Sequence, residues 1–358
     1  MSRLQVILEA VNTAGRGVIP LNEMADAIRL YYHGEIFESK RILKKIINKE
    51  PENIGALIRY AAILEELGRK EIAGKIYLKL AGLYQKDTCY EDCLEALEKA
   101  SSTVPQVELA PLKGTCLYHM GRFEEALSCF SIASKSIQNL FHTGKIYFAL
   151  KQYDNALKIF REIMSGATNN DDIFLACYWV GKSLYALGKF SEAISCLQSY
   201  VSVYQDKTQA LLELAICFLE SGSLEEAERH LLKYKELDGN IDLANLYLGI
   251  LNYRKGSYEQ AVEYLNETSS SEQSMHWKGL AYYELGLYEE AVACFYEAAK
   301  KTANPLYFKM MGSSHLKLGN YFEAKICLEK ALDADPADEE LSKLIAVTGH
   351  YLGKGELI

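Results

Sequence analysis

The stretch that decides the fold is residues 279–305, which read GLAYYELGLYEEAVACFYEAAKKTANP. Glycines, aromatic rings, small residues and a cysteine occur close together in it, as they would in a ligand pocket or in one copy of a repeated unit. Near copies of its middle part, LGLYEEAVACF, occur elsewhere, as MGRFEEALSCF at residues 120–130 and as LGKFSEAISCL at residues 187–197. The same internal spacing in separate copies favours a repeated structural unit over a single pocket.

A unit of about 34 residues aligns segments that begin at residues 20, 54, 107, 137, 174, 208, 242, 272 and 305. The fifteenth place sets the register and is Gly in every segment except at Lys151. The twentieth place is Ala in every segment except at Ser39, and the eighth is always Gly or Ala. The eighth-place residues are Ala27, Ala61, Gly114, Gly144, Gly181, Ala215, Gly249, Gly279 and Gly312.

These columns have a simple structural meaning. Apolar residues recur at helical spacing before and after the fifteenth-place glycine. A glycine there can adopt the left-handed conformation that ends a helix. Small residues at the eighth and twentieth places would let two helices cross closely. Each unit is therefore predicted to be a helix, a tight turn and a second helix, and the fold class is all-α.

The turn and second helix of these copies resemble the tetratricopeptide repeat family, and the resemblance extends over residues 20–338. It implies a right-handed α-solenoid of about nine to ten helix-turn-helix units with a C-terminal capping helix. It also implies that the first helix of each unit lines a concave groove. Such arrays usually bind segments of other proteins, and the family motif carries no catalytic residue.

The array is not uniform. Residues 90–105 have the pattern of a second helix, but the preceding helix already serves the unit that begins at Ile54. We therefore expect a phase slip at this three-helix junction. The predicted organisation is an N-terminal helix or cap (1–19), an N-terminal subarray with an irregular junction at 70–105 (20–105), a C-terminal subarray (106–338), and a capping helix with a tail (339–358).

Composition limits the function classes. The net charge of −9 without a basic stripe disfavours nucleic acid as a partner. No apolar run is long enough to cross a bilayer, which argues against membrane insertion. The nine cysteines lie in apolar periodic runs, which favours free thiols in a cytoplasmic protein. No metal-ligand, phosphate-loop or nucleophile motif is present. We therefore expect a non-enzyme without a cofactor or metal.

The resemblance also indicates where a partner would bind. The groove positions of the family, carried over by place, hold mostly rings and aliphatic residues, and Lys145 and Lys182 are the only neighbouring cations. A clamp for a terminal carboxylate is therefore disfavoured, whereas a segment with hydrophobic anchors, extended or helical, would fit. The candidate partner-binding residues are Phe141, Lys145, Phe148, Tyr178, Lys182, Tyr185, Tyr253, His276 and Tyr283.

Three alternatives stay open at this point. Some of these rings would pack against the next unit as part of the core instead of facing a partner. The chain would also suit a self-associating structural subunit of a larger assembly. Such a homo-oligomer would be joined through its N-terminal array or through the irregular junction at 70–105. An enzyme is the remotest reading, because no catalytic constellation supports it. The leading prediction is a scaffold or adaptor that binds one or more proteins.

Overall fold

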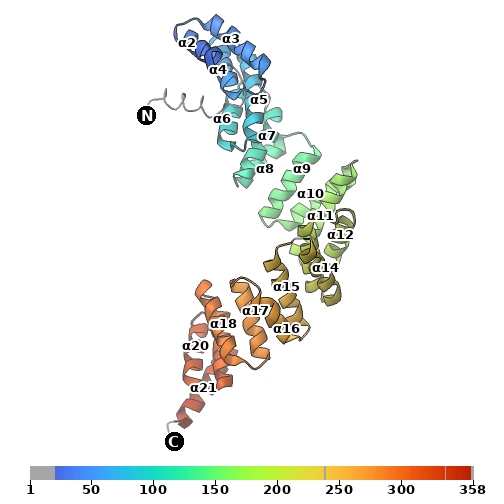
Figure 1. Cartoon of the computed structure of the whole chain (residues 1–358), viewed down its shortest axis with the longest axis vertical. Coiled ribbons are helices and arrows are strands. Elements are labelled where there is room, and N and C mark those ends of the chain that lie inside the picture. The colour runs from blue at the N-terminus through green and yellow to red at the C-terminus, as the bar shows by residue number, and fades with distance from the viewer. Residues whose placement is uncertain (1–20, 238, 335, 356–358) are drawn as a thin grey trace. The chain divides into compact units, whose positions relative to one another are not determined.

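The computed structural model describes residues 21–237, 239–334 and 336–355, and these form twenty helices, α2 to α21, with no strand among them (Figure 1). The predicted N-terminal helix or cap at 1–19 lies outside the described residues, as does the end of the tail. The contacts divide the chain into two compact units, Met1–Ala176 and Cys177–Ile358. The all-α prediction is confirmed.

In the first unit the helices follow the predicted units closely, and α11 continues into the second unit. They are α2 (Leu21–Tyr32), α3 (Ile36–Lys49), α4 (Ile54–Glu66), α5 (Lys70–Lys86), α6 (Tyr90–Ala100), α7 (Gln106–His119), α8 (Phe123–Ile132), α9 (Ile137–Ala149), α10 (Tyr153–Gly166) and α11 (Asn170–Ala186).

The second unit continues the same alternation and ends in one additional helix. It contains α12 (Phe190–Val203), α13 (Thr208–Glu220), α14 (Leu224–Glu236), α15 (Ile241–Arg254), α16 (Tyr258–Asn266), α17 (Glu272–Glu284), α18 (Tyr288–Lys301), α19 (Pro305–Leu318), α20 (Tyr321–Ala334) and α21 (Glu339–Gly355).

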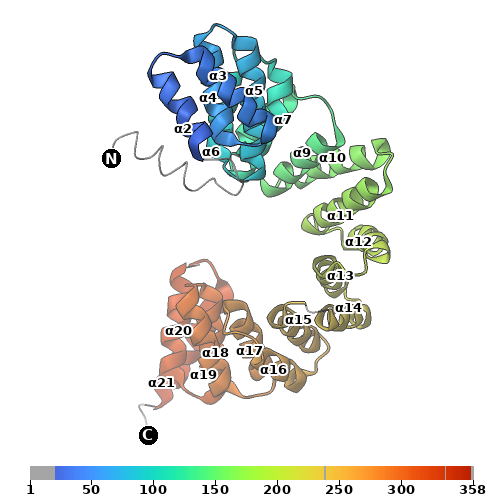
Figure 2. The ribbon, with the colours of Figure 1, turned by 45° about the horizontal axis from the view of Figure 1, so that its top comes forward.

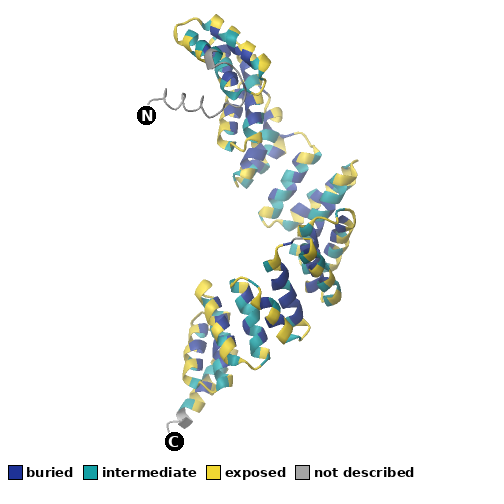
Figure 3. Cartoon of the chain, viewed as in Figure 1, coloured by how far each residue is buried: buried dark blue, intermediate teal, exposed yellow. Residues whose placement is uncertain are grey.

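Packing within each unit is between neighbours in the chain, as expected of a solenoid. First helices pack against the second helices of their pairs, for example α7 against α8 and α17 against α18. First helices of consecutive pairs also touch, as α13 touches α15 and α15 touches α17 (Figure 2). Buried residues line the faces where helices meet, and exposed residues cover the turns (Figure 3). The chain is therefore an α-solenoid of helix-turn-helix units.

The two kinds of small residue act as predicted. The fifteenth-place glycines occupy the turns with positive φ, such as 76° at Gly286. Lys151, the exception in this column, keeps the same conformation with a φ of 58°. At the eighth place, a methyl group on Gly279 would lie 2.8 Å from the ring of Phe295. One on Gly144 would lie 2.6 Å from the ring of Phe160, so these glycines permit the close helix crossing.

The junction at residues 70–105 contains a helix with two partners. Helix α5 packs against both α4 and α6. The turns on both sides of α5 have a left-handed residue, Gly68 with a φ of 69° and Thr88 with a φ of 59°. The buried Cys93 in α6 has its sulfur 3.0 Å from that of Cys116 in α7. Here α5 is the second helix of one pair and the first helix of the next. A break in the array at this point stays a prediction.

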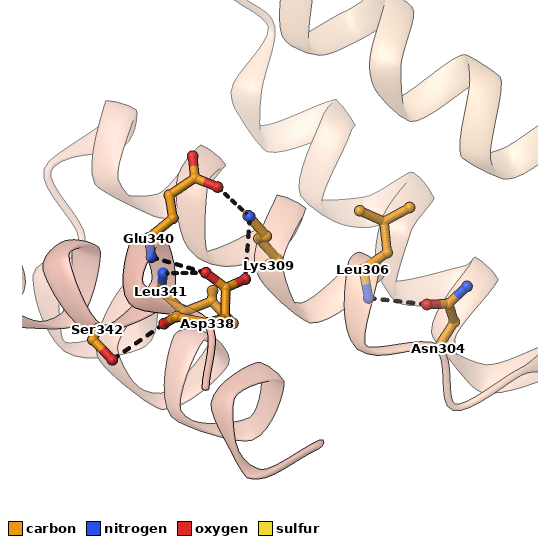
Figure 4. A network of polar contacts seen from close by, with 7 residues as sticks. All are labelled: Asn304, Leu306, Lys309, Asp338, Glu340, Leu341 and Ser342. Atoms are coloured by element: carbon orange, nitrogen blue, oxygen red, sulfur yellow. Dashed lines mark hydrogen bonds and ion pairs between the residues drawn. The ribbon is translucent and has the colours of Figure 1, made fainter. Parts of the chain in front are cut away.

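The C-terminal helix begins at polar contacts between Asp338, Glu340 and Lys309 of the last repeat pair (Figure 4). Helix α21 packs against α20 and buries Leu341 and Thr348. The Asp338 carboxylate accepts hydrogen bonds from the backbone N–H groups of Glu340 at 2.8 Å and Leu341 at 3.0 Å, which begins the helix. Lys309 on α19 forms ion pairs with Asp338 and Glu340. These contacts fix α21 on the last repeat pair.

Candidate functional site

The predicted site residues lie on first helices of the repeat pairs. Helix α9 of the first unit carries Phe141, Lys145 and Phe148, and α11 carries Tyr178, Lys182 and Tyr185. Tyr253 lies at the end of α15, and His276 and Tyr283 lie on α17. The residues on α9 and those of the second unit are described separately below, because they belong to different compact units.

In the first unit, the two predicted rings contact residues of α10. Phe141 is only 8% exposed and contacts the ring of Phe160, with centroids 6.2 Å apart. Phe148 is half-buried against Tyr153, with centroids 5.3 Å apart. Burial lowers the pKa of Lys145. The surroundings of Phe141 are those of repeat packing, whereas the ring of Phe148 is half-exposed.

Lys182 occupies a site made by its own chain. Its Nζ lies 2.8 Å from a carboxylate oxygen of Glu213 on α13. The same nitrogen lies 5.3 Å from the ring centroid of Tyr178 and 4.9 Å from that of Trp179. Tyr178 also packs against Tyr200 of α12, and its burial, reinforced by the Glu213 carboxylate, raises the pKa of its phenol. An ammonium group is thus held by two rings and one carboxylate.

Tyr185 lies where three first helices approach one another. It is 39% exposed on α11, and its phenol is near Glu220 of α13 and Tyr247 of α15. Burial, followed by the charge of Glu220, raises the pKa of Tyr185. Arg254 of α15 forms an ion pair with Glu220 at 2.9 Å and donates a hydrogen bond to the Leu219 carbonyl at 2.8 Å. This cluster joins α11, α13 and α15 side by side.

Tyr253 on α15 and Tyr283 on α17 add two more rings to the first helices of the second unit. Tyr253 meets Trp277 of α17 edge to face, with centroids 5.3 Å apart, and also contacts Tyr258. Burial, followed by the charge of Glu284, raises the pKa of Tyr253. Tyr283 is half-buried and contacts Tyr288 with centroids 5.4 Å apart. We call one set of residues on α11, α13, α15 and α17 the first-helix surface of the second unit. It consists of Lys182, Tyr185, Glu213, Glu220, Tyr253, Arg254, Trp277, Tyr283 and Glu284.

His276 differs from these residues because its ring packs between helices. Its ring lies among Trp277, Phe295 and Tyr307, with centroids 5.5, 6.4 and 5.6 Å away. Burial lowers the pKa of the imidazole, so its neutral form is favoured. We therefore assign His276 mainly to packing between α17, α18 and α19.

The structure adds residues that the sequence reasoning missed. Trp179 and Trp277 are the two tryptophans of the chain and both occupy the sixth place of their units. Glu213 and Glu220 pair with Lys182 and Arg254, the cations of α11 and α15 on this surface. A rare residue type recurring at one place was a signal that could have identified the tryptophans. The pairing of the charges depends on the distance between neighbouring first helices. The aligned repeat places do not predict that distance.

The described residues bring together no group of three or more His, Cys, Asp or Glu side chains suited to a metal ion. Over the same part of the chain, no helix has both the length and the apolar character that a transmembrane span requires. The first-helix surface combines rings with two ion pairs made within the chain and the exposed carboxylate of Glu284. Such a surface suits contact with another molecule.

Comparison with known proteins supports the repeat assignment. Family models described as tetratricopeptide repeat match residues 138–165, 181–240, 272–300 and 310–338. The chain is similar to the C-terminal part of a tetratricopeptide-repeat-containing protein from Cytophaga hutchinsonii. The two structures have a TM-score of 0.50 at 15% identity, over 65% of this chain and 98% of that one. That likeness supports the fold alone.

Two curated relatives are longer than this chain. A tetratricopeptide-repeat-containing protein of Methanocaldococcus jannaschii is 23% identical over 73% of this chain and 44% of its own length. The BBSome complex member BBS4 of Bos taurus is 23% identical over 89% of this chain and 59% of its own length. The chain thus spans about half the length of these relatives. The repeated helix pairs and the matched family models together show that the chain contains tetratricopeptide repeats.

Proposed function

We propose that this protein is a non-catalytic scaffold or adaptor that binds a segment of a partner protein on the first-helix surface of the second unit. Tetratricopeptide repeats generally mediate protein–protein interaction, and proteins of this family are generally non-catalytic. The observation that carries the placement is a set of rings on the first helices α11, α15 and α17, beside two cations that already have partners. The rings are Tyr185, Tyr253, Trp277 and Tyr283, of which Tyr253 and Trp277 are in contact.

The charge pairing supports one kind of occupant over another. A terminal carboxylate needs cations that are free to bind it. On this surface Lys182 is bound to Glu213, and Arg254 is bound to Glu220 and to the Leu219 carbonyl. Binding an anionic end would require breaking these pairs, at a cost that a surface contact does not recover easily. A segment with apolar or aromatic anchors fits the rings without that cost.

A displayed random-peptide library provides a test that needs no known partner. Peptides selected on the full chain would be measured against a Tyr185→Ala and Tyr283→Ala double variant by fluorescence anisotropy. We expect a loss of about tenfold or more, because tyrosine is enriched among the interface residues whose truncation costs more than about 1 kcal/mol.

The matched control is Tyr296→Ala. Tyr296 is 50% exposed and lies on α18, a second helix, so its removal should leave peptide affinity unchanged. Failure to select any peptide, or an equal affinity for the double variant and the wild type, would overturn the proposed surface.

A further inference from the structure

The site around Lys182 shows how this repeat array holds a cation. The ammonium group is placed over Tyr178 and Trp179, at 5.3 and 4.9 Å from the ring centroids, and 2.8 Å from the Glu213 carboxylate. The two ring faces and the carboxylate each attract positive charge. Partial burial of the site strengthens the cation–π and the charge–charge attraction. The chain therefore contains its own example of a cation site built from first-helix residues.

A second set with the same chemical groups lies further along the second unit. Tyr253 and Trp277 meet at 5.3 Å between centroids, and both rings are half-buried. Glu284, on the same helix as Trp277, is exposed and close enough to Tyr253 to raise the pKa of its phenol after the effect of burial. Within the described ranges, no Lys or Arg lies over either ring or pairs with Glu284.

The charge distribution of the chain favours a basic partner for this unit. Residues 1–176 contain 22 Lys and Arg and 22 Asp and Glu, so they carry no net charge. Residues 177–358 contain 17 Lys and Arg and 26 Asp and Glu, so the entire net charge of −9 belongs to them. An excess of negative charge attracts basic segments and repels acidic ones as they approach.

We propose that Tyr253, Trp277 and Glu284 form a binding site for a lysine or arginine side chain of a partner segment. This inference rests on the proposed function, because it names the chemistry of the segment that the first-helix surface binds. The rings supply faces for the cation and the carboxylate supplies the counter-charge, as Tyr178, Trp179 and Glu213 do for Lys182. The occupant is a protein segment with a basic residue beside its apolar anchors.

The tryptophans allow the site to be observed directly, because the chain has only two of them. Their indole N–H signals would be assigned by Trp179→Phe and Trp277→Phe in NMR spectra of the full chain. The probes are the peptides acetyl-Gly-Lys-Gly-amide and acetyl-Gly-Arg-Gly-amide, with the glutamate and norleucine analogues as comparisons. We expect the basic probes to shift the Trp277 signal in a saturable way and to leave the Trp179 signal in place. An equal response to the norleucine or glutamate probe, or no response, would overturn the site.

A charge variant then tests the carboxylate. Glu284→Gln keeps the shape of the side chain and should weaken binding of the basic probes by about two- to fivefold, the range expected for one exposed ion pair. The matched control is Glu290→Gln, which makes the same charge change on α18 and should leave the affinity unchanged. Equal weakening by both variants would show a general charge effect and would contradict a local site.

The two proposals fail in different ways. Library-selected peptides that depend on Tyr185 and Tyr283 but bind Glu284→Gln as tightly as wild type would leave the first-helix surface in place and overturn the basic-residue site. If peptide binding is also insensitive to Tyr185 and Tyr283, the surface itself is wrong. Selected peptides without Lys or Arg would also contradict the basic-residue site and would leave the first-helix surface in place.

Discussion

Lys182 and Glu213 form an ion pair of 2.8 Å that joins α11 to α13, the first helices of two consecutive repeats. The side chains are 24% and 17% exposed, so both charges are largely removed from water. A repeat array is stabilised by the interfaces between neighbours, and this pair lies at such an interface. Because Lys182 and Glu213 bind each other, neither charge is free to bind an incoming segment.

Removing one partner of this pair should destabilise the second unit. Glu213→Gln would leave the Lys182 ammonium without its counter-charge in a half-buried place, and we expect a loss of about 1–2 kcal/mol in the free energy of unfolding. Denaturation by urea, followed by circular dichroism, measures it. A double variant, Lys182→Met with Glu213→Gln, should recover part of the loss. Additive effects of the two changes would show that the residues do not interact.

Lys151 offers a stabilising change. It has a φ of 58° at the place where other repeats have glycine, and a side chain makes this conformation costly. Lys151→Gly should therefore raise the free energy of unfolding by about 1 kcal/mol. Lys151→Ala is the control, because it removes the charge and retains the Cβ atom. A gain of equal size in the alanine variant would attribute the effect to charge instead of backbone strain.

The sequence was sufficient for the fold but only partly for the surface. Gly279 and Gly286 predicted the helix crossing and the turn because each column reflects a local geometric need that recurs in every repeat. Lys182 was predicted as a groove cation, but its pairing with Glu213 depends on the distance between neighbouring first helices. Phe141 fits the same place pattern as Tyr178, and it is buried against Phe160. The place of a residue in the repeat predicts the direction of its side chain. The contacts of that side chain depend on the size of the neighbouring residues, which the repeat pattern does not specify.

The half-buried His142 of α9 should make the free energy of unfolding depend on pH. Burial, with a smaller effect of the Lys145 charge, lowers the pKa of His142 from 6.5 to about 4. Between these values the unfolded chain binds a proton that the folded chain does not. The free energy of unfolding should therefore fall as the pH decreases from 6.5 toward 4 and should change little above 6.5.

His142→Phe tests this dependence. The His142 ring stacks on Phe130 with centroids 5.5 Å apart, so phenylalanine should preserve the packing. Urea midpoints measured on both sides of the window should vary less with pH in this variant than in the wild type. The same pH profile in both proteins would show that His142 is not responsible.

The start of the capping helix can be tested with two substitutions at one position. Asp338→Ala removes both the hydrogen bonds to the N–H groups of Glu340 and Leu341 and the ion pair with Lys309, and should cost about 1 kcal/mol or more. Asp338→Asn retains the cap and loses the ion pair, so a smaller cost is expected. Thermal unfolding measures both. Equal melting temperatures for the two variants would show that the cap contributes nothing beyond the charge.

The proposal that a partner segment lies on the first-helix surface is tested most directly by photo-crosslinking. A library-selected peptide carrying a benzophenone group would be irradiated with the full chain, and the linked residues identified by mass spectrometry. We predict crosslinks on α11, α13, α15 and α17, concentrated near Tyr185, Tyr253 and Tyr283. Crosslinks confined to the second helices α12, α14, α16 and α18 would contradict the account.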